Sequence, residues 1–151
     1  MAKKAKTIYY YEAIGRRKEA VARARLYIAG KDKMAMIGDM KVKQGDIIVN
    51  KKPIGASFPS LREKAQYLNP LKLTGNDERF AISILVSGGG KIGQLDAIVL
   101  ALSRAIEKTD KETQRPILKK QGLLRRDPRV RERRKVGTGG KARRVKQSPK
   151  R

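Results

Sequence analysis

The sequence contains no cysteine and no histidine, and it has only 14 acidic residues. Without cysteine, the chain can form neither a disulfide nor a cysteine-ligated zinc site. Without histidine, it lacks the side chain that most often serves as a general base or metal ligand. The carboxylates Asp96, Asp110 and Asp127 are far apart in sequence, and cations lie near each of them. We therefore predict a protein that is not an enzyme and that carries no metal or other cofactor.

Long apolar runs are also missing. No stretch approaches the roughly 18 apolar residues that a membrane span requires. The first six residues include three lysines, but no apolar segment of the signal-peptide type follows them. We therefore expect no insertion into a membrane and a location in the cytoplasm, where the chain is made.

Positive charge is what the sequence has in excess, with 38 lysines and arginines and a formal net charge of +24. Like charges repel one another in a compact chain, and a bound polyanion relieves this repulsion through neutralisation and counterion release. A nucleic acid is the favoured partner, ahead of an anionic membrane surface. The last 30 residues alone contain 13 basic and two acidic residues. Charge thus divides the chain into a disordered basic N-terminus at 1–7, a globular domain at 8–121 and an extended basic tail at 122–151.

Strands are predicted where β-branched and aromatic residues gather or alternate with other types. The expected strands span residues 7–13, 20–28, 46–50 and 79–87. Gly15 is expected to end the first strand. In the second, Arg23 and Arg25 share one face and the alanines between them share the other. Residues 30–45 contain three glycines and several lysines, a composition typical of a loop or an irregular hairpin.

Helices are predicted from apolar residues at helical spacing and from capping residues. The expected helices span residues 60–68, 93–108 and 112–120. Ser60 and Glu63 form a capping box for the first helix, which Asn69 and Pro70 are expected to stop. Gly122 is a natural C-cap for the third. Together, the elements predict an α+β domain with the helices on one side of a sheet.

The basic tail carries its cations in clusters, and arginine outnumbers lysine nine to four. Arginine can hold a phosphate bidentately and stack on a base, whereas lysine is a mobile point charge. This preference favours ordered contact with RNA over a solvated tail that binds any polyanion weakly. In the tail and the helix before it, the predicted RNA contacts are Lys119, Lys120, Arg125, Arg126, Arg129, Arg133, Arg134, Lys141, Arg143 and Arg144.

Residues 15–18 read Gly-Arg-Arg-Lys and bring three cations to an expected turn between two strands. Such a cluster is a compact phosphate site, and an ordinary solvated basic turn is the alternative. Two further arginines lie on the adjoining strand face. The predicted nucleic-acid contacts here are Arg16, Arg17, Lys18, Arg23 and Arg25.

A glycine-rich loop at 88–94 follows a predicted strand and opens the longest predicted helix. Backbone N–H groups at such a helix start can hold a phosphate. The pattern is not a Walker A motif, and it matches the dinucleotide fingerprint poorly. An RNA phosphate is the favoured ligand, and a purely structural tight turn or a small-nucleotide site are the alternatives. The residues concerned are Gly88, Gly89, Gly90, Lys91, Gly93 and Gln94.

Taken in order along the chain, the motifs resemble the bacterial form of the universal small-subunit ribosomal protein number nine. The resemblance covers residues 8–151, nearly the whole chain. The matching segments are 15–18 with 20–23, 49–50 with 53–54, 71–75, 88–90 with 93–94, 115–116 with 118–120, 122–124 with 126–129, 132–133, 141–144 and 150–151.

This family resemblance implies a two-layer α/β sandwich like the second domain of ribosomal protein number five, with a left-handed βαβ crossover and a long extended basic tail. It implies a structural constituent of the small ribosomal subunit that binds the head (3′ major) domain of ribosomal RNA. The C-terminal arm is expected to reach the peptidyl site and to contact the tRNA anticodon stem-loop through Lys150 and Arg151. The implied partners are small-subunit rRNA, peptidyl-site tRNA and neighbouring head proteins, without a homo-oligomer.

Two features depart from the family pattern. Pro149 occupies the position of the serine that usually precedes the closing Lys-Arg pair, and proline offers no N–H group. The segment formed by residues 31–45 is longer than in the usual family pattern, and we interpret it as a lineage-specific hairpin.

Two other functions remain open at this point. A general nucleic-acid condenser would share the basic tail but would not need the glycine loop or the Gly-Arg-Arg-Lys segment. A small phosphotransferase could use the glycine loop, but the chain lacks the histidine and the paired carboxylates that such chemistry favours.

Overall fold

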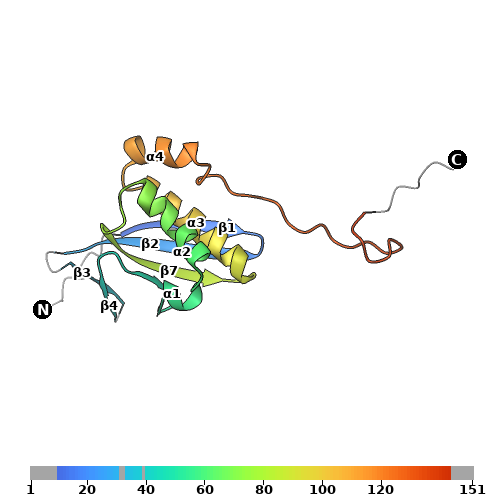
Figure 1. Cartoon of the computed structure of the whole chain (residues 1–151), viewed down its shortest axis with the longest axis horizontal. Coiled ribbons are helices and arrows are strands. Elements are labelled where there is room, and N and C mark those ends of the chain that lie inside the picture. The colour runs from blue at the N-terminus through green and yellow to red at the C-terminus, as the bar shows by residue number, and fades with distance from the viewer. Residues whose placement is uncertain (1–9, 31–32, 39, 144–151) are drawn as a thin grey trace, which may run out of the picture.

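The computed structural model describes residues 10–30, 33–38 and 40–143. Figure 1 shows a folded body, residues 10–120, and an extended segment that leads away from it. We call residues 121–143 the arm. The N-terminal residues 1–7 lie outside the described part. The elements of the body are β1 (Tyr10–Arg17), β2 (Ala20–Ile28), β3 (Met34–Ile37), β4 (Met40–Lys43), β5 (Ile47–Val49), β6 (Lys52–Pro53), α1 (Ile54–Ser57), α2 (Leu61–Leu73), β7 (Phe80–Ser87), α3 (Lys91–Glu107) and α4 (Lys111–Lys120).

Five of the strands form one sheet in the order β1-β2-β7-β5-β6. β2 is antiparallel to both of its neighbours, whereas β5 and β7 are parallel, so the chain crosses over between them through α1 and α2. In β2, Ala22, Ala24 and Leu26 are completely buried, while Val21 and Arg23 are exposed. The predicted alternation of β2 is therefore confirmed up to Leu26, whereas Ile28, which the same pattern placed on the buried face, is exposed. The alternation determines which face of the sheet receives the helices.

Helix α3 forms the centre of the core. It packs across β1 and β2, and α2 lies beside it (Figure 1). Ile98, Leu102 and Ile106 are fully buried, at the helical spacing that the sequence predicted. Burying a large apolar side chain contributes roughly 1.5–3 kcal/mol, so this face of α3 stabilises the body. The α+β class is thereby confirmed.

Gly15 does not end β1, contrary to the prediction. The strand continues to Arg17, so two of the three clustered cations belong to it and only Lys18 lies in the turn. A Cβ atom at Gly15 would lie 2.1 Å from the carbonyl oxygen of Ala97 and 2.5 Å from the backbone nitrogen of Ala101. The close approach of α3 to β1 therefore requires this glycine, and no turn is involved.

Helix α2 also departs from the prediction, because it continues through Pro70 to Leu73. A proline inside a helix removes one backbone hydrogen bond. The ring of Pro70 is buried alongside Tyr67 and Leu71, and we attribute the helix's tolerance of proline to this burial. At the other end the capping box is confirmed, with the Ser60 N–H donating to the Glu63 carboxylate at 3.2 Å.

The other helix boundaries differ by one or two residues from expectation. α3 begins at Lys91 with Gly90 as its N-cap. α4 begins at Lys111, because the carboxylate of Asp110 accepts hydrogen bonds from the first free N–H groups of the helix. Gly122 follows α4 with a φ of +70°, which confirms the predicted C-terminal glycine.

The segment of uncertain role between β2 and β5 forms the antiparallel hairpin of β3 and β4, as predicted. Ala35 and Val42 from this hairpin pack with Tyr27 and Ala81 in a second, small apolar cluster. Because Tyr27 and Ala81 alternate with residues of the main core, this cluster lies on the sheet face opposite the helices. The hairpin therefore covers part of that face.

Candidate nucleic-acid interface

The turn after β1 and the glycine loop before α3 lie side by side, although they are far apart in sequence. Between them is a hollow of about 310 Å³, lined by Arg17, Lys18 and residues 89–93. The N-cap of α3 is Gly90, which offers no side-chain hydrogen bond to the helix. The first backbone N–H groups of α3 therefore lack a side-chain cap at this hollow, and they suit an anion such as a phosphate.

The first glycines of the loop are explained by packing. Gly88 and Gly89 have φ angles of +71° and +63°, which favour glycine. A Cβ at Gly88 would lie 2.4 Å from the Glu19 carbonyl oxygen, and one at Gly89 would lie 2.9 Å from Cβ of Ala20. The Gln94 side chain donates to the Gly88 carbonyl at 3.1 Å. The structural-turn interpretation therefore accounts for these glycines and for Gln94.

The second half of the loop remains available to a ligand. Gly90 and Gly93 line the hollow beside Lys91. The ammonium of Lys91 lies 2.7 Å from the Glu63 carboxylate, and this hydrogen bond lowers the pKa of Glu63. The Lys91 side chain is still half exposed. Lys91 thus contributes positive charge at the start of α3 while it joins that helix to α2.

Arg25 is held by protein groups. Its Nε donates to Glu12 at 2.6 Å, and its guanidinium lies 5.0 Å from the centre of the Tyr10 ring. The hydrogen bond to Glu12 raises the pKa of Arg25. Arg17 is likewise surrounded by acceptors, from Asp96 and the base of the arm, and its side chain is only 15% exposed. The structure therefore ties two predicted RNA contacts to carboxylates of the same chain.

The sheet face opposite the helices is open at the end that the hairpin does not cover. Ile14, Val21 and Leu85 are exposed there. Together with Arg23 they line a shallow hollow of about 400 Å³. A neighbouring hollow of about 360 Å³ lies between Ile14, Arg16, Arg104 and Arg126. Cations from β1, α3 and the arm thus line the second hollow, and the first, which shares Ile14 with it, carries Arg23 of β2.

Sequence reasoning missed Arg104, which lies in the last turns of α3 among buried residues. Its guanidinium donates to the Ile14 carbonyl at 3.1 Å. Lys108, just after the same helix, donates to the Glu12 carbonyl at 2.6 Å. A signal was present, because polar residues at helical spacing on an otherwise apolar helix mark its solvent-facing edge.

In the arm and at the end of α4, most of the predicted contacts face solvent. Two arginines of the arm form ion pairs within it: Arg129 with Asp127 at 2.7 Å, and Arg143 with Glu132 at 2.9 Å. The hydrogen bonds from Arg129 hold the pKa of Asp127 well below its usual range. Arg144, Lys150 and Arg151 lie outside the described residues. Exposed side chains belong to Lys119, Lys120, Arg125, Arg126, Arg129, Arg133, Arg134, Lys141 and Arg143.

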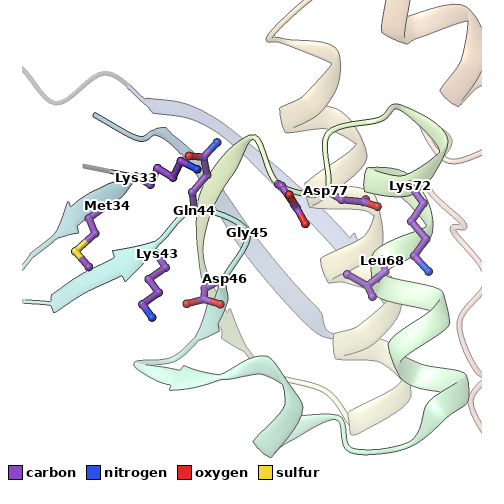
Figure 2. A pocket seen from close by; sticks show the side chains of 10 residues that line it. Lys33, Met34, Lys43, Gln44, Gly45, Asp46, Leu68, Lys72 and Asp77 are labelled. Carbon is purple, nitrogen blue, oxygen red and sulfur yellow. The ribbon is translucent and has the colours of Figure 1, made fainter. Parts of the chain in front are cut away.

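A larger hollow, of about 650 Å³, lies between the β3–β4 hairpin and the end of α2 (Figure 2). None of the predicted contact residues lines it. Three lysines there face three acidic residues, so the local charge is balanced and does not favour a phosphate. The charged residues concerned are Lys33, Lys43, Lys72, Asp46, Asp77 and Glu78.

Residues 10–30, 33–38 and 40–143 contain no cluster of metal-ligating side chains and no helix suited to cross a membrane. No group of three or more acidic side chains in this part of the chain is arranged to hold a metal ion. None of its helices combines the length and the apolar character needed to cross a membrane.

Comparison with known proteins gives one consistent result. The family model described as ribosomal protein S9/S16 matches residues 15–151. The small ribosomal subunit protein uS9 of Pelodictyon phaeoclathratiforme is 44% identical over 126 residues, which cover 83% of this chain and 86% of that protein. The uS9 of Chlorobium limicola is 40% identical over 126 residues, which again cover 83% of this chain and 86% of that protein. The uS9 of Dehalococcoides mccartyi is 41% identical over 128 residues, or 85% of this chain and 86% of the relative.

Proposed function

The chain belongs to the ribosomal protein S9/S16 family, and from this premise we propose that it is a structural, RNA-binding component of the small ribosomal subunit that acts in cytoplasmic translation. The observation that carries the proposal is the match over residues 15–151. The formal charge of +24 supports it, because a protein inside an rRNA particle faces phosphates from many directions. In this role the chain needs no catalytic group of its own.

We further propose that the bound rRNA is the head domain of the small subunit. Two surfaces of the body suit phosphates: the start of α3 beside Lys18, and the open sheet face around Arg16 and Arg23. The exposed cations of α4 add to these surfaces, and those of the arm extend the proposed contact beyond the body. Phosphate contacts of this kind fix the position of a protein on RNA without reading its sequence.

The tip of the tail is proposed to contact peptidyl-site tRNA through Lys150 and Arg151. A fully extended chain spans at most about 3.5 Å per residue, so residues 122–151 could reach roughly 100 Å from the body. Neighbouring head proteins are the remaining proposed partners. Deleting Lys150 and Arg151 should weaken tRNA binding to the peptidyl site while assembly continues. Failure of the shortened protein to assemble would contradict this division of roles.

We infer a sandwich like the second domain of ribosomal protein number five, with a left-handed crossover between β5 and β7. The parallel pairing of these strands and the passage through α1 and α2 support a βαβ unit. Most such units are right-handed, so superposition of an experimental structure on that domain is a demanding test.

Sedimentation tests the proposed function directly. A tagged copy of the chain should travel with the small subunit in a cell lysate, and its absence from that fraction would refute the proposal. Binding of a head rRNA fragment and of random duplex DNA should then be compared at matched salt. Preference for the rRNA fragment is expected, whereas equal affinity would favour the general nucleic-acid condenser.

A further inference from the structure

Arg17 is positioned where the arm leaves the body. Its Nε donates to Oδ2 of Asp96, in α3, at 3.4 Å. Its Nη1 donates to the backbone carbonyls of Asp127 and Arg129 at 3.3 and 2.8 Å. Its Nη2 lies 3.1 Å from Oδ2 of Asp127. One guanidinium thus connects β1, α3 and the first residues of the arm.

The acceptors around Arg17 are themselves held in place. The Gln66 side chain donates to the second oxygen of Asp96 at 2.9 Å. The backbone N–H of Arg129 donates to Asp127 at 2.9 Å, and its guanidinium binds the same carboxylate. These bonds lower the pKa of Asp127. Pro128, between the two carbonyls that Arg17 binds, has a fixed φ and stiffens the segment.

The arrangement is unusual for a cation whose task is to bind phosphate. The chain has few acidic residues, yet two of their carboxylates contact this one guanidinium, one at Nε and one at Nη2. They neutralise it, and they occupy the N–H groups that a phosphate would need. A planar guanidinium can bind four acceptors in different directions, and a lysine ammonium cannot reproduce that geometry.

We propose that Arg17, Asp96 and Asp127 form a latch that fixes the direction in which the arm leaves the body. Arg17 is then a positioning residue, and it acts on RNA through the arm without contacting a phosphate. The consequence for RNA rests on the proposed function, whereas the latch itself does not. A latched arm approaches RNA already oriented, so binding costs less conformational entropy than it would for a free arm.

The direction of the arm can be measured without RNA. The chain has no cysteine, so single cysteines at Lys64 on α2 and Val136 in the arm, both exposed, can carry spin labels. The wild-type background should give a narrow distance distribution. Arg17→Lys keeps the charge but loses the geometry, and it should widen the distribution at least about twofold, as for a segment released to coil-like behaviour.

Two controls accompany this measurement. Arg62→Lys makes the same change at an exposed position of α2, and Glu132→Gln removes the ion pair with Arg143 inside the arm. Both should leave the distribution narrow. An unchanged distribution in Arg17→Lys would overturn the latch. Asp127→Ala, in the arm, breaks the latch from the other side and should widen the distribution too, even if the Arg17 variant folds poorly.

RNA binding provides a test in which the latch and simple electrostatics predict opposite changes in affinity. Asp127→Ala removes a negative charge, so electrostatics alone would strengthen binding to a head rRNA fragment. The latch predicts the reverse, a loss of roughly tenfold in affinity, even though the change frees Arg129 from its ion pair. Equal or tighter binding by Asp127→Ala would overturn the positioning role. If the wild-type chain itself does not bind the fragment, the proposed function fails, and the distance measurement still judges the latch.

Discussion

Two arginines of the body, Arg17 and Arg25, differ from the arginines of the arm in what surrounds them. In the body, the side chains of Arg17 and Arg25 are 15% and 29% exposed, and carboxylates bind both. In the arm, even the paired side chains of Arg129 and Arg143 are 84% and 85% exposed. Of the 14 acidic residues, 11 precede residue 111, so the arm has few partners for its cations.

This difference shows that the number of cations in a segment does not give the number available to RNA. Packing in the body brings carboxylates to particular arginines, which then stabilise the fold. The arm has no buried core, so its cations depend on an external polyanion for neutralisation. Changes in the body should therefore alter stability first, and changes in the arm should alter RNA binding first.

The largest expected effect is on the contact between β1 and α3. Gly15→Ala would place a Cβ against the backbone of α3, so the free energy of unfolding should fall by at least about 3 kcal/mol. Urea denaturation measures this change. The matched control is Gly30→Ala, because a Cβ there meets nothing within 4 Å. Val136→Ala, at a fully exposed position of the arm, should also leave the midpoint unchanged; a drop would contradict the comparison.

A smaller effect, on the salt dependence of RNA binding, distinguishes cations that carboxylates of the body bind from the exposed cations of the arm. Replacing Arg133 and Arg134 by glutamine should reduce the salt slope of rRNA binding by roughly one to two units, about one for each phosphate that the arm then leaves unneutralised. Arg25→Gln should leave the slope unchanged, because Glu12 already neutralises that guanidinium. Titrations of a head rRNA fragment at several salt concentrations measure both slopes. Equal slope changes in the two variants would remove the distinction between body and arm.

The smallest expected effect is a loss of folding stability at acidic pH. Hydrogen bonds from Thr113 lower the pKa of Asp110, and the bond to Lys91 lowers that of Glu63. A carboxyl whose pKa is lower in the folded state adds stability above its unfolded pKa, near 4, and this contribution is lost as the pH falls through the folded value. The urea midpoint should therefore decline below about pH 4. Asp110→Asn should flatten this decline, and an unchanged pH profile would show that the cap does not titrate as inferred.

Much of the fold could be predicted because it depends on local pattern. The alternation of β2, the apolar stripe of α3, the capping box at Ser60 and the glycine after α4 were all visible in sequence. The continuation of α2 through Pro70 was not, because it depends on the burial of that ring. The prediction that Gly15 ends the first strand is wrong, because nothing in the neighbouring sequence indicates that a helix packs against this residue.

The sequence by itself determined the charge of the chain, the concentration of cations in its last 30 residues, the family, and the order of the main elements. Only the tertiary structure decided which cations remain available. Arg17 binds Asp96 and Asp127, which are 79 and 110 residues away in sequence. Such partners meet only when the chain folds, and electrostatic pairing depends on distance in space. The same Gly-Arg-Arg-Lys segment that suggested a phosphate site therefore supplies, in Arg17, the residue that joins the arm to the body.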